Sequence, residues 1–205
     1  MKNTVSVDIT LDVSCIWSYL AFTRYRRAAA RFRDEGGHVD LTIRSWQVEP
    51  GAVGGESKLA QSLARFGESG VARVNALAAA EGIPLDFAKA LTAGTRHAHQ
   101  LIAMAADQGL GEAMTARLFQ AHFVDGAHIG SLGVLRALAA EQGVRWDETV
   151  PVPWAREVTA VPVFRFGRQP ALHGGTLSEE ALYGQLTVVA NARPRWRPAC
   201  RGASG

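Results

Sequence analysis

The feature that most constrains the fold is a change of hydrophobic period within the first 46 residues. Residues 4–13 (TVSVDITLDV) and residues 38–46 (HVDLTIRSW) alternate apolar and polar side chains, as strands with one buried face do. Between them, residues 17–34 carry apolar side chains at helical spacing, and Gly36-Gly37 closes this segment. A strand, a helix and a strand of these lengths are most simply a right-handed unit with two parallel strands.

The segment that follows has a different, Ala-rich character. Its helical spacing predicts helices over 56–66, 69–81, 87–107, 112–123 and 131–142, which Gly, Pro or Asp residues separate. We therefore expect an all-helical block after the parallel unit.

The chain then returns to strand-like segments. Residues 161–167 (VPVFRFG) and 169–174 (QPALHG) are short and apolar, and only Gly167-Arg168 separates them, which predicts an antiparallel hairpin. Ser178 is suited to cap a last helix, and the acidic pair Glu179-Glu180 suits the positive end of its dipole.

This element order predicts an α/β protein with a thioredoxin-like, four-stranded mixed sheet (β-α-β, then β-β-α) and a large all-helical insertion. Residues 1–50 and 151–192 are expected to form the thioredoxin-like domain. Residues 51–150 are expected to form the helical insertion domain, and residues 193–205 an irregular basic tail.

Composition narrows the class of protein. The 205 residues are 47% hydrophobic and 20% charged, as in ordinary globular proteins, and no apolar run approaches the roughly 20 residues of a membrane span. The amino terminus alternates like a strand and lacks the apolar run of a secretory signal, so we expect a cytoplasmic protein without membrane contact. The net charge of +3 owes much to the tail arginines, and no groove-reading motif accompanies them, so no nucleic-acid partner is expected.

No metal site is predicted either. His97 and His99 are two residues apart on a helix and point in different directions, and no carboxylate completes a cluster with them, His122 or His128. We expect these histidines to be structural or exposed.

The two cysteines, Cys15 and Cys200, are too few for a disulfide scaffold. Cys15 falls where the first strand ends and the first helix begins, a usual place for ligand sites in α/β sheets. The free amides of residues 16–18 and the helix dipole favour a thiolate there and predict a lowered thiol pKa. The alternative is a small buried side chain, since free cysteine is often buried.

The dipeptide Val161-Pro162 precedes a strand of the hairpin, a position that proline tolerates. In a thioredoxin-like sheet this loop lies beside the helix that carries Cys15. The bond is either trans or the rarer cis, and the sequence leaves that open.

The stretch DVSCIWSYLA (12–21) together with VPVF (161–164) resembles the DsbA-like branch of the thioredoxin superfamily. The similar families are the FrnE-type oxidoreductases, the 2-hydroxychromene-2-carboxylate isomerases and the kappa-class glutathione transferases. Cys15 and Trp17 match the oxidoreductases, whereas Ser18-Tyr19-Leu20-Ala21 matches the isomerases. Further matches follow in the family's order: Glu49-Pro50, Ala98-His99-x-Leu101, Leu118-Phe119-x-Ala121-x-Phe123, Asp125-Gly126 and Val161-Pro162-x-Phe164.

The chain departs from the resembling families at three positions. Ile16 replaces the usual proline, Ser18 replaces the resolving cysteine, and Gly94 stands where an asparagine is frequent. With serine at position 18, no local disulfide can close, so a mixed disulfide at Cys15 would need an external thiol or Cys200. Cys200 is more simply an incidental thiol on the tail, although the tail is long enough to reach.

The neighbours of Cys15 have two interpretations each. The Ser18 hydroxyl either forms a hydrogen bond with the sulfur or faces the backbone. Trp17 either shields the sulfur or offers an aromatic face to a flat substrate, or it packs in the core. Asp12 either relays a proton and tunes the Cys15 pKa, or is a solvated carboxylate at the strand end.

The resemblance implies three functions. The first is a monothiol Cys-x-x-Ser thiol-disulfide oxidoreductase with Cys15 and Ser18 as catalytic residues. The second is an isomerase or transferase of an aromatic small molecule, with a polyketide as one possible substrate, in which Trp17, Val161 and Pro162 hold a thiol cofactor. The third is a noncatalytic binding protein. No tightly bound cofactor is expected; glutathione or another small thiol, a small-molecule or protein substrate, and a second copy in a homodimer are the expected partners.

Overall fold

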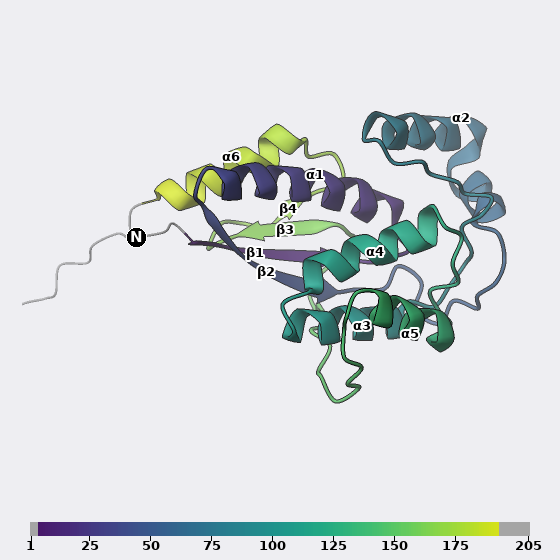
Figure 1. The fold of residues 1–205 in the computed structure, drawn as a ribbon. Helices are drawn as coiled ribbons and strands as arrows, with labels where there is room; N and C mark the ends of the chain where they lie inside the picture. The colour runs from purple at the N-terminus through teal and green to yellow at the C-terminus, as the bar shows by residue number, and fades with distance from the viewer. Residues whose placement is uncertain (1–3, 193–205) are drawn as a thin grey trace, which may run out of the picture.

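The computed structural model describes residues 4–192 (Figure 1). Its elements in chain order are β1 (Thr4–Leu11), α1 (Ile16–Asp34), β2 (His38–Ser45), α2 (Lys58–Ala80), α3 (Arg96–Asp107), α4 (Gly111–Phe123), α5 (Leu132–Glu141), β3 (Val163–Phe166), β4 (Leu172–His173) and α6 (Glu179–Asn191). The predicted order of strands and helices is confirmed.

The four strands form one mixed sheet with the order β2-β1-β3-β4. β1 runs parallel to β2, with Ile9 opposite Ile43, and antiparallel to β3, with Ile9 opposite Phe164. β3 and β4 form the antiparallel hairpin. The chain therefore has the thioredoxin-like mixed sheet that the sequence predicts, with α2 to α5 inserted between β2 and β3.

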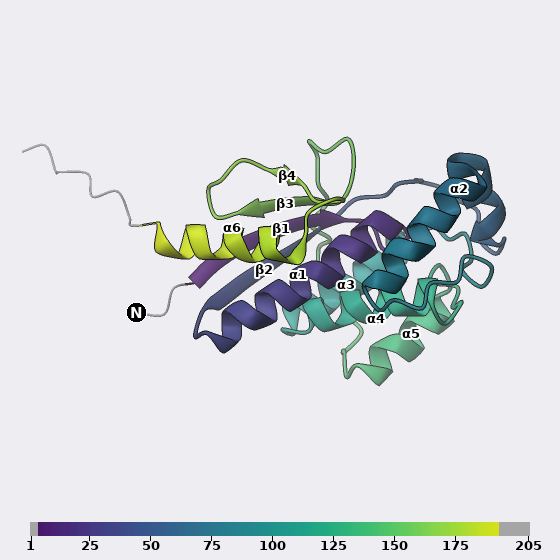
Figure 2. The ribbon, with the colours of Figure 1, turned by 90° about the horizontal axis from the view of Figure 1, so that it is seen from above.

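Helices α1 and α6 lie side by side over one face of the sheet, and α3 and α4 pack together near β2 (Figures 1 and 2). Helix α2 lies beyond the carboxyl end of β1, at the end of the molecule where α1 begins. This arrangement brings the start of α1 and the start of α2 to the same edge.

The alternation in β1 decides which face is buried. Its apolar side chains, Val5, Val7, Ile9 and Leu11, are fully buried against the core, whereas Thr4 and Ser6 are exposed. Burial of one such side chain contributes about 1.5–3 kcal/mol. This strand therefore anchors the turn that follows it.

One predicted helix is partly wrong. The sequence predicts a helix over 87–107, but the helix begins only at Arg96. The preceding residues instead pair with the segment before α2: the Thr92 amide donates to the Glu56 carbonyl (2.7 Å), and the Lys58 amide donates to the Ala90 carbonyl (2.8 Å). These long-range hydrogen bonds compete with the local helix and prevail.

The break predicted between the helices over 56–66 and 69–81 is confirmed: α2 consists of two helical parts that meet at a kink, where Gly67 is non-helical (φ 67°, ψ 175°). One further expectation differs in detail. The hairpin connection is longer than Gly167-Arg168, because β3 ends at residue 166 and β4 starts at residue 172.

The last helix begins as predicted. The Ser178 hydroxyl accepts a hydrogen bond from the Ala181 amide (3.2 Å), and Glu179 and Glu180 occupy the first turn. The predicted basic tail, including Cys200, lies outside the described residues. The division into two domains stays a prediction. Among residues 4–192, no helix has the length and apolar character needed to cross a membrane.

Candidate active site around Cys15

Cys15 is the N-cap residue of α1, in an extended conformation (φ −93°, ψ 115°). Its amide donates to the Asp12 carbonyl (3.0 Å), which closes the turn after β1, and its carbonyl accepts from the Tyr19 amide (3.1 Å), which opens the helix. The buried strand on one side and the buried first turn of α1 on the other therefore fix the position of the sulfur.

The expectation of a lowered Cys15 pKa is wrong. Burial raises the pKa of the thiol, and the nearby negative charge of Asp12 raises it further. The hydroxyl and amide of Ser18 and the amide of Trp17 lower the pKa, but they do not offset burial. Cys15 is therefore predominantly a neutral thiol at neutral pH.

Ser18 lies behind the sulfur, one helical turn on. Its side chain is fully buried, and its hydroxyl influences the Cys15 sulfur without forming a hydrogen bond of normal geometry within residues 4–192. Cys15 is the only cysteine in this part of the chain, and it is free. The described site therefore has one sulfur, with a hydroxyl where a resolving thiol would stand.

The loop before β3 faces Cys15. The Val161 carbonyl lies 3.9 Å from the Cys15 sulfur, within reach of an S–H donor. The peptide bond between Val161 and Pro162, which the sequence left open, is cis. Residues separated by 146 positions thus meet at one point.

A pocket of about 180 Å³ opens at this point. Its lining comes from the start of α1, the segment after β2, the first half of α2, the segment between α2 and α3, the end of α4 and the loop before β3: Ser14, Cys15, Ile16, Trp17, Trp46, Val48, Glu49, Lys58, Gln61, Ser62, Arg65, Phe66, Phe87, Phe123, Thr159, Ala160 and Val161. Of the predicted site residues, Cys15, Trp17 and Val161 line the pocket. Asp12, Ser18 and Pro162 are outside this lining, and Asp12 and Ser18 are fully buried.

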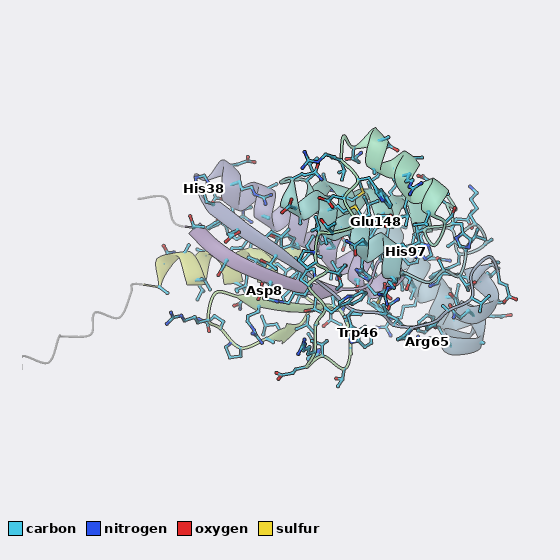
Figure 3. The ribbon with its side chains drawn as sticks, turned by 90° about the horizontal axis from the view of Figure 1, so that it is seen from below. Asp8, His38, Trp46, Arg65, His97 and Glu148 are labelled. Atoms are coloured by element: carbon cyan, nitrogen blue, oxygen red, sulfur yellow. The ribbon has the colours of Figure 1, made fainter. Side chains whose placement is uncertain are left out.

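The other side of the pocket is cationic, which sequence reasoning missed. The Lys58 ammonium donates to the Ser14 carbonyl (3.0 Å), and Arg65, about two turns further along α2, lines the same pocket. Burial lowers the pKa of Lys58, while the charges of Glu49, Asp12 and Cys15 raise it. Glu49 is in turn held by the Gln61 amide (2.8 Å). Figure 3 shows Arg65 and Trp46 at this end of the molecule.

Asp12 is not the solvated carboxylate that we considered. It is fully buried, and it accepts hydrogen bonds from the Val48 amide (2.8 Å), the Ser14 hydroxyl (2.9 Å) and the Ser14 amide (3.3 Å), and contacts His99 Nε2 (3.2 Å). Burial raises the pKa of Asp12, but these partners outweigh burial and lower it. The sequence signal for His99 was its place in the matched Ala98-His99-x-Leu101 segment.

Comparisons with known proteins agree with this fold. A crystal structure of a probable DsbA oxidoreductase from Streptomyces coelicolor matches with a TM-score of 0.79 and 23% identity over 98% of this chain and 96% of that one. The cytosolic disulfide reductase DsbM from Pseudomonas aeruginosa matches with a TM-score of 0.62 and 21% identity, covering 89% and 97%. A 2-hydroxychromene-2-carboxylate isomerase matches with a TM-score of 0.55 and 16% identity, covering 83% and 89%.

At these identities, the structural matches establish the fold. No curated protein sequence matches the chain significantly. The model of the DSBA-like thioredoxin domain matches residues 6–153, which is more than half of the chain and includes Cys15 and Lys58. This chain therefore belongs to the DSBA-like thioredoxin domain family, a family whose structural relatives include both oxidoreductases and an isomerase.

Proposed function

We propose that the protein is a monothiol thiol-disulfide oxidoreductase that exchanges a small thiol through Cys15. The observation that carries this proposal is the single sulfur on the pocket wall, with Ser18 in place of a second thiol. A dithiol enzyme resolves its mixed disulfide internally, whereas this site leaves that step to an incoming molecule.

The exchange takes place in two balanced steps. Cys15 loses its proton to solvent, and the thiolate attacks one sulfur of a disulfide RS–SR; a Cys15–SR bond forms, and the other half leaves as RS⁻ and takes up a proton. A second thiol then attacks the mixed disulfide, so that Cys15 is released and a new external disulfide forms. Because burial raises the Cys15 pKa, we expect the first step to accelerate as the pH rises above neutral.

The pocket suits an acidic small thiol such as glutathione. Lys58 and Arg65 supply positive charge on one side, and Trp17 and Val161 lie beside the sulfur on the other. In this proposal Trp17 and Val161 hold the thiol against Cys15, and Lys58 neutralises one of its carboxylates. A reducing compartment such as the cytoplasm would supply the resolving thiol.

The test is mass spectrometry of the intact protein after incubation with oxidised glutathione. We expect one glutathionyl group on Cys15, removed when reduced glutathione is added. The Cys15→Ser variant should carry none at that position, while Cys200→Ser should behave as the parent. A Cys15 that remains unmodified at pH 9, where the thiolate is more populated, would refute monothiol exchange.

A second candidate is an isomerase or transferase that uses a thiol cofactor. The observation that favours it is the half-buried Cys15 thiol on the pocket wall, whose raised pKa keeps it neutral, so that it can donate a hydrogen bond to a bound cofactor thiolate instead of attacking. The aromatic rings of Trp17, Trp46 and Phe123 line the same pocket and suit a flat substrate. In this case the Cys15→Ser variant retains cofactor binding, because a serine hydroxyl can donate the same hydrogen bond. A protein that binds the cofactor thiol but turns over no aromatic substrate would instead be a noncatalytic binding protein.

A further inference from the structure

A buried contact between a histidine and a carboxylate lies behind the turn that carries Cys15. His99 Nε2 is 3.2 Å from Asp12 Oδ1, and neither side chain is more than 1% exposed. The second carboxylate oxygen accepts from the Ser14 hydroxyl and from the Val48 amide, and the Asp12 carbonyl accepts from the Cys15 amide. One residue thus joins α3, the end of β2 and the start of α1.

The hydrogen bonds of the ring indicate how His99 acts. Its Nδ1 is buried and has no partner among the described residues, so a proton there would be an unpaired buried donor. A ring that carries its proton on Nε2 instead donates it to Asp12 and leaves Nδ1 as a bare lone pair, which costs less. The indole of Trp154 packs edge-on against the ring (5.5 Å between centroids) and restricts its rotation.

We propose that His99 is a positioning residue for Cys15, which donates a hydrogen bond from Nε2 to Asp12 and thereby keeps that carboxylate ionised behind the Cys15 turn. The proposal deepens the function proposed above, since it concerns the same thiol. Asp12 then acts on Cys15 in two ways, through the hydrogen-bonded turn and through its charge.

The other ionisable groups around Asp12 do not replace His99. His122 on α4 is buried, and burial lowers its pKa to about 3, so it carries no charge at neutral pH. Lys58 on α2 carries a positive charge, but its ammonium donates to the Ser14 carbonyl. Its charge interacts with Glu49 and Cys15 as well as with Asp12. Without an N–H from residue 99, the remaining Ser14 and Val48 donors must hold a fully buried carboxylate, and we expect its pKa to rise.

The test compares two substitutions at one position, His99→Leu and His99→Gln. Glutamine keeps a permanent N–H donor for Asp12, whereas leucine keeps the bulk and removes the donor. The readout is the rate at which iodoacetamide alkylates Cys15 between pH 5 and 10, followed on the Cys15 peptide by mass spectrometry so that Cys200 does not contribute.

With glutamine, Asp12 stays ionised, and we expect the alkylation rate of Cys15 to follow a single titration step, that of the Cys15 thiol. With leucine, Asp12 gains a proton at low pH and Cys15 loses its negative neighbour there. The reaction at pH 5.5, normalised to pH 9.5, should then be faster than in His99→Gln by several-fold to about tenfold, the effect of up to about one pKa unit. At pH 8 and above, the parent should follow His99→Gln.

His97→Leu is the matched control, because His97 is exposed on the same helix two residues away (Figure 3), and its profile should follow the parent. Superimposed profiles for His99→Leu and His99→Gln would overturn the proposal. If His99→Leu does not fold, Asp12→Asn provides the test: its Cys15 titration midpoint should fall below that of the parent, and an unchanged or higher midpoint would also overturn it. Alkylation does not require disulfide exchange, so failure of the glutathione experiment and failure of this one are separate results.

Discussion

The two walls of the Cys15 pocket are built differently. The α1 wall is part of the core: Ile16, Leu20 and Phe22 are 5% exposed or less, and Cys15 and Trp17 project from among them. The wall formed by the first half of α2 buries only Ser62, although Lys58, Gln61, Arg65 and Phe66 of this segment line the pocket. Polar contacts, such as those of Lys58 with the Ser14 carbonyl and of Gln61 with Glu49, hold this second wall.

In the proposed function, this difference separates the group that reacts, Cys15, from the cationic groups that bind the anionic thiol, Lys58 and Arg65. Apolar packing fixes the sulfur, because core side chains have few alternative arrangements. The cationic side chains are on the first half of α2, which ends at the break at Gly67 and has no fully buried apolar side chain, as is typical of the less stable parts of a protein. We therefore expect the two walls to respond differently to matched substitutions.

The largest expected effect is on stability, from the same substitution in each wall. Leu20→Ala removes a fully buried side chain in α1 and should lower the free energy of unfolding by about 3 kcal/mol. Leu63→Ala removes a side chain that is 37% exposed in α2 and should cost less than about 1 kcal/mol. Urea denaturation measures both, and equal losses would contradict the contrast between the walls.

The second prediction concerns the break in α2. Gly67 has φ 67° and ψ 175°, a region that side chains other than glycine rarely enter, so Gly67→Ala should destabilise this segment by about 1–3 kcal/mol even though its Cβ would meet no atom within 4 Å. Gly184→Ala in α6 also places its Cβ in open space but requires no unusual φ, and it should stabilise by about 0.5–1 kcal/mol. Amide hydrogen exchange of residues 58–66 should accelerate in Gly67→Ala and not in Gly184→Ala. Unchanged exchange in Gly67→Ala would mean that the backbone at Gly67 does not determine the stability of the first half of α2.

The smallest expected effect is on ligand affinity. Lys58→Met should weaken the binding of an anionic thiol by about tenfold, or about 1.4 kcal/mol, because it removes one positive charge from the pocket wall. Since burial lowers the Lys58 pKa, the parent should lose affinity as the pH rises toward that pKa, below the usual range for lysine, and the variant should lack this pH dependence. Lys89→Met, at an exposed lysine, is the control. Calorimetric titration with oxidised glutathione measures these affinities. Equal affinity for the parent and Lys58→Met would show that Lys58 does not contribute to binding.

The parts of the fold that the sequence predicts are those that local patterns specify. Alternation identified β1 and β2, and the Ser178 cap identified the start of α6. The helix expected over 87–107 was too long because its first residues pair with the segment around Ser57, about 30 residues earlier. A local sequence pattern cannot predict that this long-range pairing replaces the start of the helix.

The same limit applies to the site. Cys15, Trp17 and Val161 could be grouped in advance because the parallel unit and the hairpin bring their loops to one edge of the sheet. Lys58 and Arg65 could not, since their place depends on how α2 crosses the pocket. The buried state of Asp12 depends on His99, which is 87 residues away, and the raised Cys15 pKa depends on packing that encloses the sulfur.

The serine in the turn after Cys15 also has a kinetic consequence. With one cysteine within residues 4–192, this part of the chain cannot form an internal disulfide and so cannot hold oxidising equivalents between encounters. In the proposed cycle each turnover then ends in a collision with a free thiol, so its last step is second order. The enzyme would act as a relay whose direction and speed follow the thiol concentration around it, and dilution of that thiol alone would stop it in the mixed-disulfide state.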